Sequence, residues 1–199
     1  MAANRISNLS EEERRTLLQL ARESIRAAAS RQGLPKPDLG TLPASLADEG
    51  ACFVTLYRGK ELRGCTGTLL ARIPLAQEVV QTAAQTALYD PRFYPVTPDE
   101  VGLLTIEISV LTPPTKLLLN DPRDLPNRIR PGIDGVTLSQ GSHRATFLPQ
   151  VWDKVGDPIH FLEMLSQKMG LSAGAWSQRG TEAEVYQVEE FSEKQPGAP

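Results

Sequence analysis

The sequence predicts an α+β protein with a mainly antiparallel sheet flanked by helices. Residues 104–111 alternate apolar and polar side chains, which is the pattern of a half-buried strand. Short apolar runs joined by tight turns occur at 51–69 and again at 133–148, which indicates hairpins. Helical segments lie between these groups of strands and do not alternate with them one for one. A doubly wound parallel sheet is therefore not expected.

The first helix has clear signals at both ends. Ser10 and Glu13 have the spacing of a capping box, in which each side chain binds the backbone N–H of the other residue. Apolar residues then recur at helical spacing as far as Ala28. Gly33 favours an end to this helix, and residues 33–50 are predicted as an ordered loop.

Two further helices are predicted from their end signals. Pro74 opens the first of them, and Asp90–Pro91 ends it because a residue before proline is pushed out of the α region. Asp157 is the predicted N-cap of the second, with Pro158 in the first turn. Gly170 is the expected stop, since glycine readily adopts the left-handed conformation that follows a helix.

The strands are predicted as short apolar or alternating runs bounded by turn residues. These runs are residues 51–57, 61–69, 104–111, 133–139, 144–148 and 183–191. Residues 120–132 are rich in proline, aspartate and arginine and are predicted as a long connection. Residues 192–199 are predicted as a disordered tail, which leaves residues 1–191 as a single domain.

Composition argues against several classes of function. The net charge of -3 and the 6% aromatic content argue against a nucleic-acid partner, which needs basic patches and stacking side chains. No apolar run approaches the ~20 residues that cross a bilayer, so no membrane association is expected. Residues 1–5 are not followed by the apolar core of a signal peptide, and a cytoplasmic protein is predicted.

The two cysteines, Cys52 and Cys65, are too few for a disulfide framework and are expected to be reduced. Together with His143 and His160 they lack the compact spacing of metal ligands. There is also no Walker loop and no Rossmann glycine pattern. No metal and no other cofactor is therefore predicted.

The most unusual segment places a cysteine between two glycines in a predicted strand. Gly64 and Gly67 flank Cys65, and a glycine in a strand marks a bulge or a close approach to the backbone. Arg63 and nearby backbone N–H groups would stabilise a thiolate, which makes Cys65 a candidate nucleophile. The alternative is a buried structural cysteine beside a bulge.

Asp90 and Arg92 form a second candidate group, at the predicted end of a helix. They are close enough in sequence to orient each other or an anion, although a solvated ion pair at a helix end is the alternative. Glu107 lies on the polar side of the strand at 104–111. It is either a carboxylate in a cleft or a glutamate that faces solvent.

Several motifs in fixed order make the chain similar to a known family. They are Leu-Arg-Gly-Cys-Thr-Gly-Thr at 62–68, Asp-Pro-Arg-Phe-Tyr-Pro at 90–95, Ile-Glu-Ile-Ser-Val-Leu at 106–111, Phe-Leu-Pro-Gln-Val at 147–151, Phe161-Leu162-Glu163, Lys168-Met169-Gly170-Leu171 and Trp176. Across residues 9–191 the chain resembles the AMME chromosomal region protein family, called AmmeMemoRadiSam system protein A in prokaryotes. The resemblance implies a larger and a smaller lobe around an antiparallel sheet. It also implies a gene neighbourhood with a Memo-type protein and a radical-SAM enzyme, which makes these two proteins candidate partners.

Two functions are open at this point, because the resemblance implies no established activity. In the first, Cys65 is the reactive thiol of an enzyme or enzyme subunit that acts on a small anionic substrate. The substrate would be bound by Arg63, Gly64, Gly67, Asp90, Arg92 and Glu107. In the second, the chain is a non-catalytic accessory protein that binds its partners or a ligand through the same surface. The sequence identifies no general base for Cys65 and no oligomeric state. The enzyme interpretation requires the segments around Cys65 and Arg92 to converge.

Overall fold

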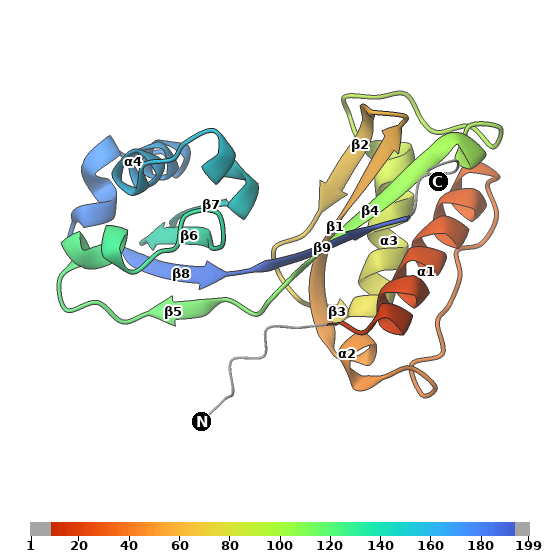
Figure 1. Cartoon of the computed structure of the whole chain (residues 1–199), viewed down its shortest axis with the longest axis horizontal. Helices are drawn as coiled ribbons and strands as arrows, with labels where there is room; N and C mark the ends of the chain where they lie inside the picture. Colours follow the sequence, from red (N-terminus) through yellow and green to blue (C-terminus); the bar gives the residue numbers. More distant parts are fainter. Residues whose placement is uncertain (1–8, 194–199) are drawn as a thin grey trace. The chain divides into compact units, whose positions relative to one another are not determined.

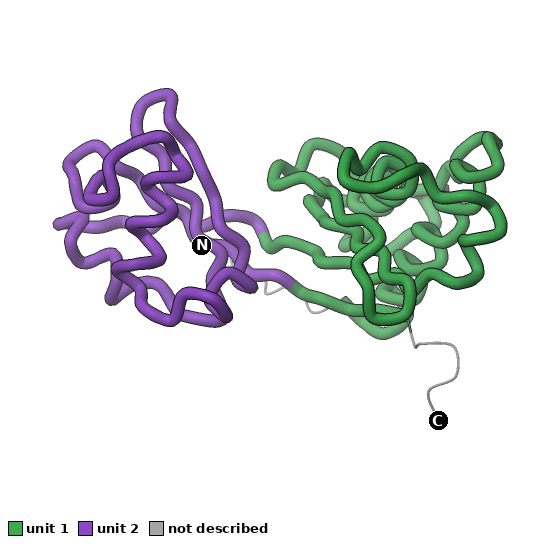
Figure 2. The backbone as a smooth tube through the Cα atoms, turned by 90° about the horizontal axis from the view of Figure 1, so that it is seen from above, with its two compact units in different colours: residues 1–112, 189–199 green, residues 113–188 purple. Residues whose placement is uncertain are grey.

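The computed structural model describes residues 9–193 (Figure 1). The chain divides into two compact units, shown in separate colours in Figure 2. Unit 1 holds the residues up to Thr112 and those from Glu189 onward, and unit 2 is Pro113–Val188. Each unit has its own antiparallel sheet and its own hydrophobic core, which confirms the predicted α+β class. In chain order, unit 2 is an insertion into unit 1.

The structure contains four α-helices, four 3-10 turns and nine strands within residues 9–193. The helices and turns are α1 (Glu11–Ala29), α2 (Ala44–Ala47), α3 (Leu75–Tyr89), η1 (Val101–Leu103), η2 (Pro122–Asn127), η3 (Pro149–Asp153), α4 (Pro158–Lys168) and η4 (Ala173–Ser177). The strands are β1 (Glu49–Arg58), β2 (Glu61–Gly67), β3 (Ile73–Pro74), β4 (Leu104–Leu111), β5 (Thr115–Leu117), β6 (Gly135–Gln140), β7 (His143–Phe147), β8 (Glu182–Tyr186) and β9 (Val188–Ser192). No helix in this described part of the chain has the length and apolarity to span a membrane.

The sheet of unit 1 has the strand order β2-β1-β4-β9, and β3 adds a short pairing with β1. Helices α1 and α3 cover the same face of this sheet (Figure 1). The alternation of β4 accounts for the burial, because Ile106 and Ile108 are fully buried in the core while Glu107 between them is only half-buried. The opposite face of the sheet therefore carries the side chains of alternate residues, Glu107 among them.

Helix α1 begins at the predicted capping box, with both reciprocal bonds between Ser10 and Glu13 present. Two arginines then tie this helix to the last strand of the described chain. Arg14 binds Glu189 at 2.8 Å, and Arg22 binds the carboxylate of Glu193. The last strand is thus held to unit 1 by side chains as well as by its place in the sheet.

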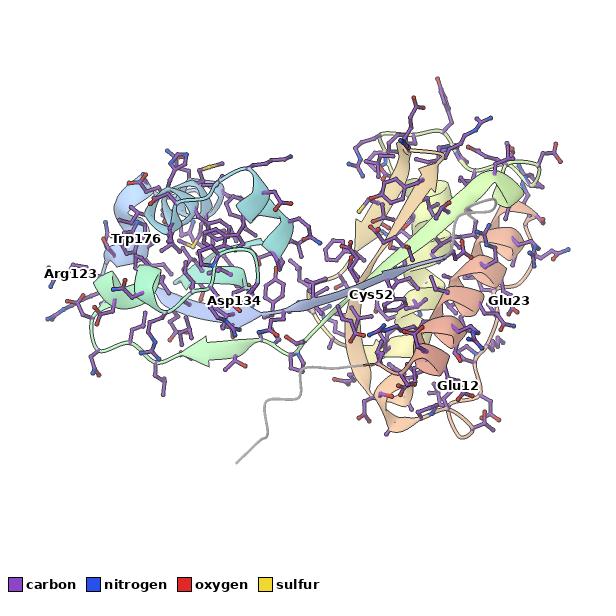
Figure 3. All side chains as sticks on the ribbon, viewed as in Figure 1. Glu12, Glu23, Cys52, Arg123, Asp134 and Trp176 are labelled. Atoms are coloured by element: carbon purple, nitrogen blue, oxygen red, sulfur yellow. The ribbon has the colours of Figure 1, made fainter. Side chains whose placement is uncertain are left out.

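Unit 2 has the strand order β5-β8-β6-β7 and a core built against α4. Phe161 of α4 is fully buried, and its ring stacks on Trp152 with the two ring centroids 3.7 Å apart. Trp152 donates its indole N–H to the carbonyl of Asp134 at 2.7 Å. The buried carboxylate of Asp134, marked in Figure 3, is paired with Arg130 at 2.7 Å.

The structure corrects the prediction at the end of the chain. The single strand predicted at 183–191 is two strands, β8 and β9, which belong to different sheets. The tail prediction is wrong for Ser192, which lies in β9, and for Glu193, whose N–H donates to the carbonyl of Ile106. Residues 194–199 of the predicted tail lie outside the described residues.

Among the α-helices and strands, three short elements are not predicted by the sequence, namely α2 within the loop at 33–50, β3, and β5. They have two to four residues each, which is too short to show a hydrophobic period.

Candidate functional site

Cys65 lies on the face of the unit 1 sheet that is opposite α3. The neighbouring residues of β2 show this, because the hydroxyl of Thr66 bonds that of Thr86 on α3 at 2.6 Å. A Cβ atom at Gly64 would also meet Thr86, at 3.0 Å from its methyl group. Successive side chains of a strand point to opposite faces, so the thiol of Cys65 points away from the helix.

Four polar side chains share this opposite face, and we call them the thiol face: Thr55, Tyr57, Cys65 and Glu107. The sheet register places Thr55 directly between Cys65 on one side and Glu107 on the other. Thr55 donates its hydroxyl to the sulfur of Cys65 at 3.3 Å. Tyr57 donates its hydroxyl to the carboxylate of Glu107, also at 3.3 Å. A thiol, two hydroxyls and a carboxylate thus stand together on one surface.

Two groups of the thiol face, Glu107 and Tyr57, have raised pKa values. Burial raises the pKa of the Glu107 carboxyl, and the nearby charge of Glu190 raises it further, against a hydrogen bond from Tyr57 that lowers it. Burial also raises the pKa of Tyr57, and the charge of Glu107 adds to that effect. A hollow of about 290 Å³ lies beside these groups, and Tyr57, Glu107 and Lys60 are among its lining residues.

Packing explains both glycines of the cysteine motif. At Gly67 a Cβ atom would lie 2.4 Å from the ring of Phe53 and 2.5 Å from the carbonyl oxygen of Cys52. At Gly64 it would press on the methyl group and the carbonyl of Thr86. Each glycine therefore allows β2 to approach a neighbouring element closely. The register also breaks between Gly64 and Leu62, which confirms a bulge at Arg63 between them.

Asp90 and Arg92 meet Cys65 at its backbone. The Asp90 carboxylate accepts the N–H of Cys65 at 2.8 Å, and Arg92 donates from Nη2 to the carbonyl of Cys65 at 3.0 Å. Hydrogen bonds from Arg92 hold the pKa of Asp90 well below its usual range. The carboxylate of Asp90 is almost fully buried, with 2% of its side chain exposed, whereas the side chain of Arg92 is 54% exposed, so only the arginine of this ion pair is solvated.

Arg63 does not join this group. Its guanidinium donates twice to Glu100, at 2.7 and 3.0 Å, and stands 5.9 Å from the ring centroid of Phe93. Arg92 is the guanidinium that contacts Cys65, through the backbone carbonyl of that residue, and its hydrogen bond with Asp90 raises the pKa of Arg92.

The structure therefore brings most of the predicted site residues together, in two different relationships to the thiol. Glu107 shares a face with the thiol, whereas Asp90 and Arg92 bind the backbone of the same cysteine from the end of α3. Thr55 and Tyr57 were missed. Their alternation with Val54 and Leu56, both fully buried, is the signal that would have found them.

The second cysteine, Cys52, differs from Cys65 in burial. Cys52 on β1 is fully buried within unit 1 (Figure 3), and burial raises the pKa of its thiol to about 12. Cys65 is half-buried by comparison. Residues 9–193 also contain no group of three or more His, Cys, Asp or Glu side chains arranged to hold a metal ion.

Comparison with known proteins identifies the family. The family model named AMMECR1 matches residues 18–191. The chain belongs to the AMMECR1 family. It is 34% identical to a protein of Thermofilum pendens, over 96% of this chain and 94% of that one. It is 36% identical to a protein of Methanosarcina acetivorans, over 94% and 95% of the two chains.

A solved structure supports the same assignment. It is the crystal structure of the uncharacterised protein PH0010 from Pyrococcus horikoshii, with a TM-score of 0.78 and 33% identity over 92% of each chain. The AMMECR1 relatives support the fold of this chain, but they supply no established reaction for it. The thiol face is therefore the feature of this chain that points to a reaction.

Proposed function

We propose that this AMMECR1-family chain is a cysteine-dependent enzyme, or the thiol-bearing subunit of one. Cys65 is the nucleophile, and the substrate binds on the thiol face. The observation that carries the proposal is the row across the sheet in which Thr55 lies between the Cys65 thiol and the Glu107 carboxylate. Packing explains Gly64 and Gly67, but it gives no structural reason for the half-buried cysteine between them.

Each residue of the thiol face has a defined part in such a reaction. The thiolate of Cys65 attacks an electrophilic carbon of the substrate, so that an S–C bond forms and the bond from carbon to the leaving group breaks. The leaving group departs with the bonding electrons and takes a proton from Glu107. The raised pKa of Glu107 makes it a better proton donor near neutral pH than an ordinary glutamate. Water then breaks the S–C bond, its oxygen going to the carbon and one of its protons to the sulfur, and transfer of that proton to Glu107 restores the thiolate and the protonated carboxyl.

The charged groups restrict which substrate fits. Arg63 is occupied by Glu100, so it supports the predicted anionic substrate less than its sequence position suggests. Arg92 is the better candidate, because its side chain is 54% exposed and its guanidinium lies next to Cys65. We therefore propose a small substrate that has an anionic group near Arg92 and an electrophilic carbon at the thiol.

The test of this proposal uses a simple ester as the probe. We expect the wild-type protein to release p-nitrophenolate from p-nitrophenyl acetate and to carry an acetyl group on Cys65, seen by mass spectrometry of its peptides. Cys65→Ser should lose both signals, because a hydroxyl is a far weaker nucleophile than a thiolate. It should also keep its circular dichroism spectrum, since the thiol fills no core position.

Cys52→Ala is the matched control and should retain the acetylation of Cys65, because Cys52 lies in the core with a pKa of about 12. Equal ester hydrolysis by wild type and Cys65→Ser, with no acetyl group on Cys65, would end the proposal of a cysteine nucleophile.

A second prediction concerns Glu107 and the pH dependence of stability. Its folded-state pKa is raised, so the folded protein loses stability as pH rises from about 4 through that pKa. Glu107→Gln removes this loss. We expect the variant to be about 0.5 kcal/mol more stable than wild type to urea unfolding at pH 7 and no more stable at pH 4.

Glu100→Gln is the contrasting control for Glu107→Gln. The pKa of Glu100 is lowered by its hydrogen bonds with Arg63, so its contribution to stability is present above about pH 4 and is lost as pH falls. We expect this variant to lose about 1 kcal/mol at pH 7. If both variants change stability in the same direction at pH 7, the electrostatic account of Glu107 is wrong.

A second candidate function is a non-catalytic accessory protein, and exposed aromatic side chains favour it. Tyr89 is 73% exposed and Tyr94 is 90% exposed, on either side of the turn that holds Asp90 and Arg92. Tyrosine and arginine are enriched at the centres of protein interfaces. The Memo-type and radical-SAM partners implied by the resemblance belong to this proposal. It predicts that Tyr94→Ala weakens partner binding while Cys65→Ser does not.

A further inference from the structure

The backbone of Cys65 is held from outside the sheet. Strand β2 is at one end of the strand order, with β1 as its neighbour in the sheet. Cys65 is paired with Thr55, but its N–H and C=O bind the side chains of Asp90 and Arg92. Those two groups therefore point off the edge of the sheet, where water or a further strand would otherwise satisfy them.

The two side chains act as one rigid unit. Arg92 donates from Nε to Asp90 at 2.9 Å and from Nη2 at 2.7 Å, and its own N–H binds the same carboxylate at 3.1 Å. Such a paired arrangement restricts the orientation of both groups. We call this ion pair, together with its two bonds to Cys65, the backbone clamp.

The clamp determines where the thiol can point. A strand residue whose N–H and C=O are both fixed has a fixed Cα–Cβ direction. For Cys65 this direction leads onto the thiol face, where the hydroxyl of Thr55 reaches the sulfur. The bulge at Arg63 interrupts the pairing of β2 two residues earlier, so the ladder alone holds this part of β2 less firmly.

We infer that Asp90 and Arg92 are positioning residues, which hold Cys65 by its backbone so that its thiol stays in the row with Thr55 and Glu107. This inference deepens the proposed function and rests on it. It changes the role of Asp90 from substrate binding to positioning, because the buried carboxylate is already occupied by donors from Arg92 and Cys65. Arg92 takes part in positioning through Nη2, while its exposed side remains open to an anionic group.

The experiment measures alkylation of Cys65 by iodoacetamide as a function of pH in the full chain. The plateau rate at high pH reports access to the thiolate, and the midpoint of the profile reports the local charge. We expect Arg92→Lys to raise the plateau rate of Cys65 about tenfold, which corresponds to the loss of about 1.4 kcal/mol of local protection. The midpoint should stay close to that of wild type, because lysine keeps the positive charge.

Two matched variants and an internal reference exclude a general loss of stability. Arg130→Lys changes an equivalent pair in unit 2, with the same 2% exposure of its carboxylate side chain. Arg14→Lys weakens an ion pair elsewhere in unit 1. Neither should change the plateau rate of Cys65. Cys52, which is fully buried on the neighbouring strand, should stay unlabelled in all the variants.

The inference is overturned if Arg92→Lys leaves the plateau rate of Cys65 unchanged, or if Cys52 becomes labelled in parallel, which would indicate general opening of unit 1. Should Arg92→Lys fail to fold, Asp90→Asn offers the same test, because asparagine keeps an acceptor but weakens the pair. Failure of ester hydrolysis would remove the enzymatic proposal and leave this labelling result standing. The two ideas can therefore fail separately.

Discussion

Phe161→Ala is expected to destabilise unit 2 by about 4 kcal/mol, because it deletes a large ring from a core that cannot collapse to fill the space. The ring of Phe161 is fully buried between two others. It stacks on Trp152 at an interplanar angle of 3° and meets Phe147 edge-on at a centroid distance of 5.3 Å. Loss of both aromatic contacts adds to the cost of the cavity.

The chain provides a separate probe for each unit. Both of its tryptophans, Trp152 and Trp176, belong to the core of unit 2, so tryptophan fluorescence in urea follows that unit. Labelling of Cys52 follows unit 1. We expect the fluorescence transition of Phe161→Ala to move to lower urea while Cys52 stays protected. Ile159→Ala is the control, since Ile159 is 48% exposed on the same helix, and it should unfold like wild type.

A loss of less than about 1 kcal/mol in Phe161→Ala would contradict the view of Phe161 as the centre of this core. Labelling of Cys52 that rises together with the fluorescence change would show that the two cores do not unfold separately.

Gly67→Ala should destabilise unit 1 by about 3 kcal/mol, the upper part of the usual range for overpacking. The new methyl group would lie 2.4 Å from the ring of Phe53, which can rotate, and 2.5 Å from the carbonyl oxygen of Cys52, which cannot move without breaking the sheet. Gly64→Ala should cost about 1 kcal/mol, because its contacts with Thr86 are longer, at 3.0 and 3.1 Å.

Urea unfolding followed by circular dichroism, together with labelling of Cys52, measures both variants. Gly102→Ala serves as the control, because a Cβ atom there meets no other atom within 4 Å. We expect it to match wild type within about 0.5 kcal/mol. A Gly67→Ala variant as stable as Gly102→Ala would mean that close packing is not the reason for the second glycine of the cysteine motif.

Local sequence signals predicted the elements whose causes are local. The capping box at Ser10, the stop at Asp90 and the N-cap at Asp157 each lie where the sequence placed them, because each depends on contacts within a few residues. The division of 183–191 into β8 and β9 could not be seen in this way. Both halves have strand character, and which sheet each half joins is decided by partners far away in the chain.

Local signals in the sequence likewise predict some residues of the candidate site but not their distant partners. Cys65 and Glu107 stood out because a thiol between glycines and a carboxylate in an alternating strand are unusual in themselves. Arg63 was assigned to the thiol on proximity in sequence, but its partner is Glu100, and no sequence period connects the two. Thr55 and Tyr57 do not stand out in the sequence, because residues 51–57 form an apolar run whose alternation appears only in the burial of the strand.

The return of the chain to unit 1 has a consequence for synthesis on the ribosome. Strand β9 completes the sheet beside β4, and the carboxylate of Glu189 accepts the N–H of Leu9 near the start of α1. Unit 1 therefore begins first but cannot be completed until the residues around Glu193 have emerged. At about 5–20 residues per second, translation of residues 113–188 takes roughly 4 to 15 seconds. Throughout that interval the nascent chain carries β4 without its outer neighbour, and unit 2 can close only at the end of it, when β8 has emerged to join β5 to β6.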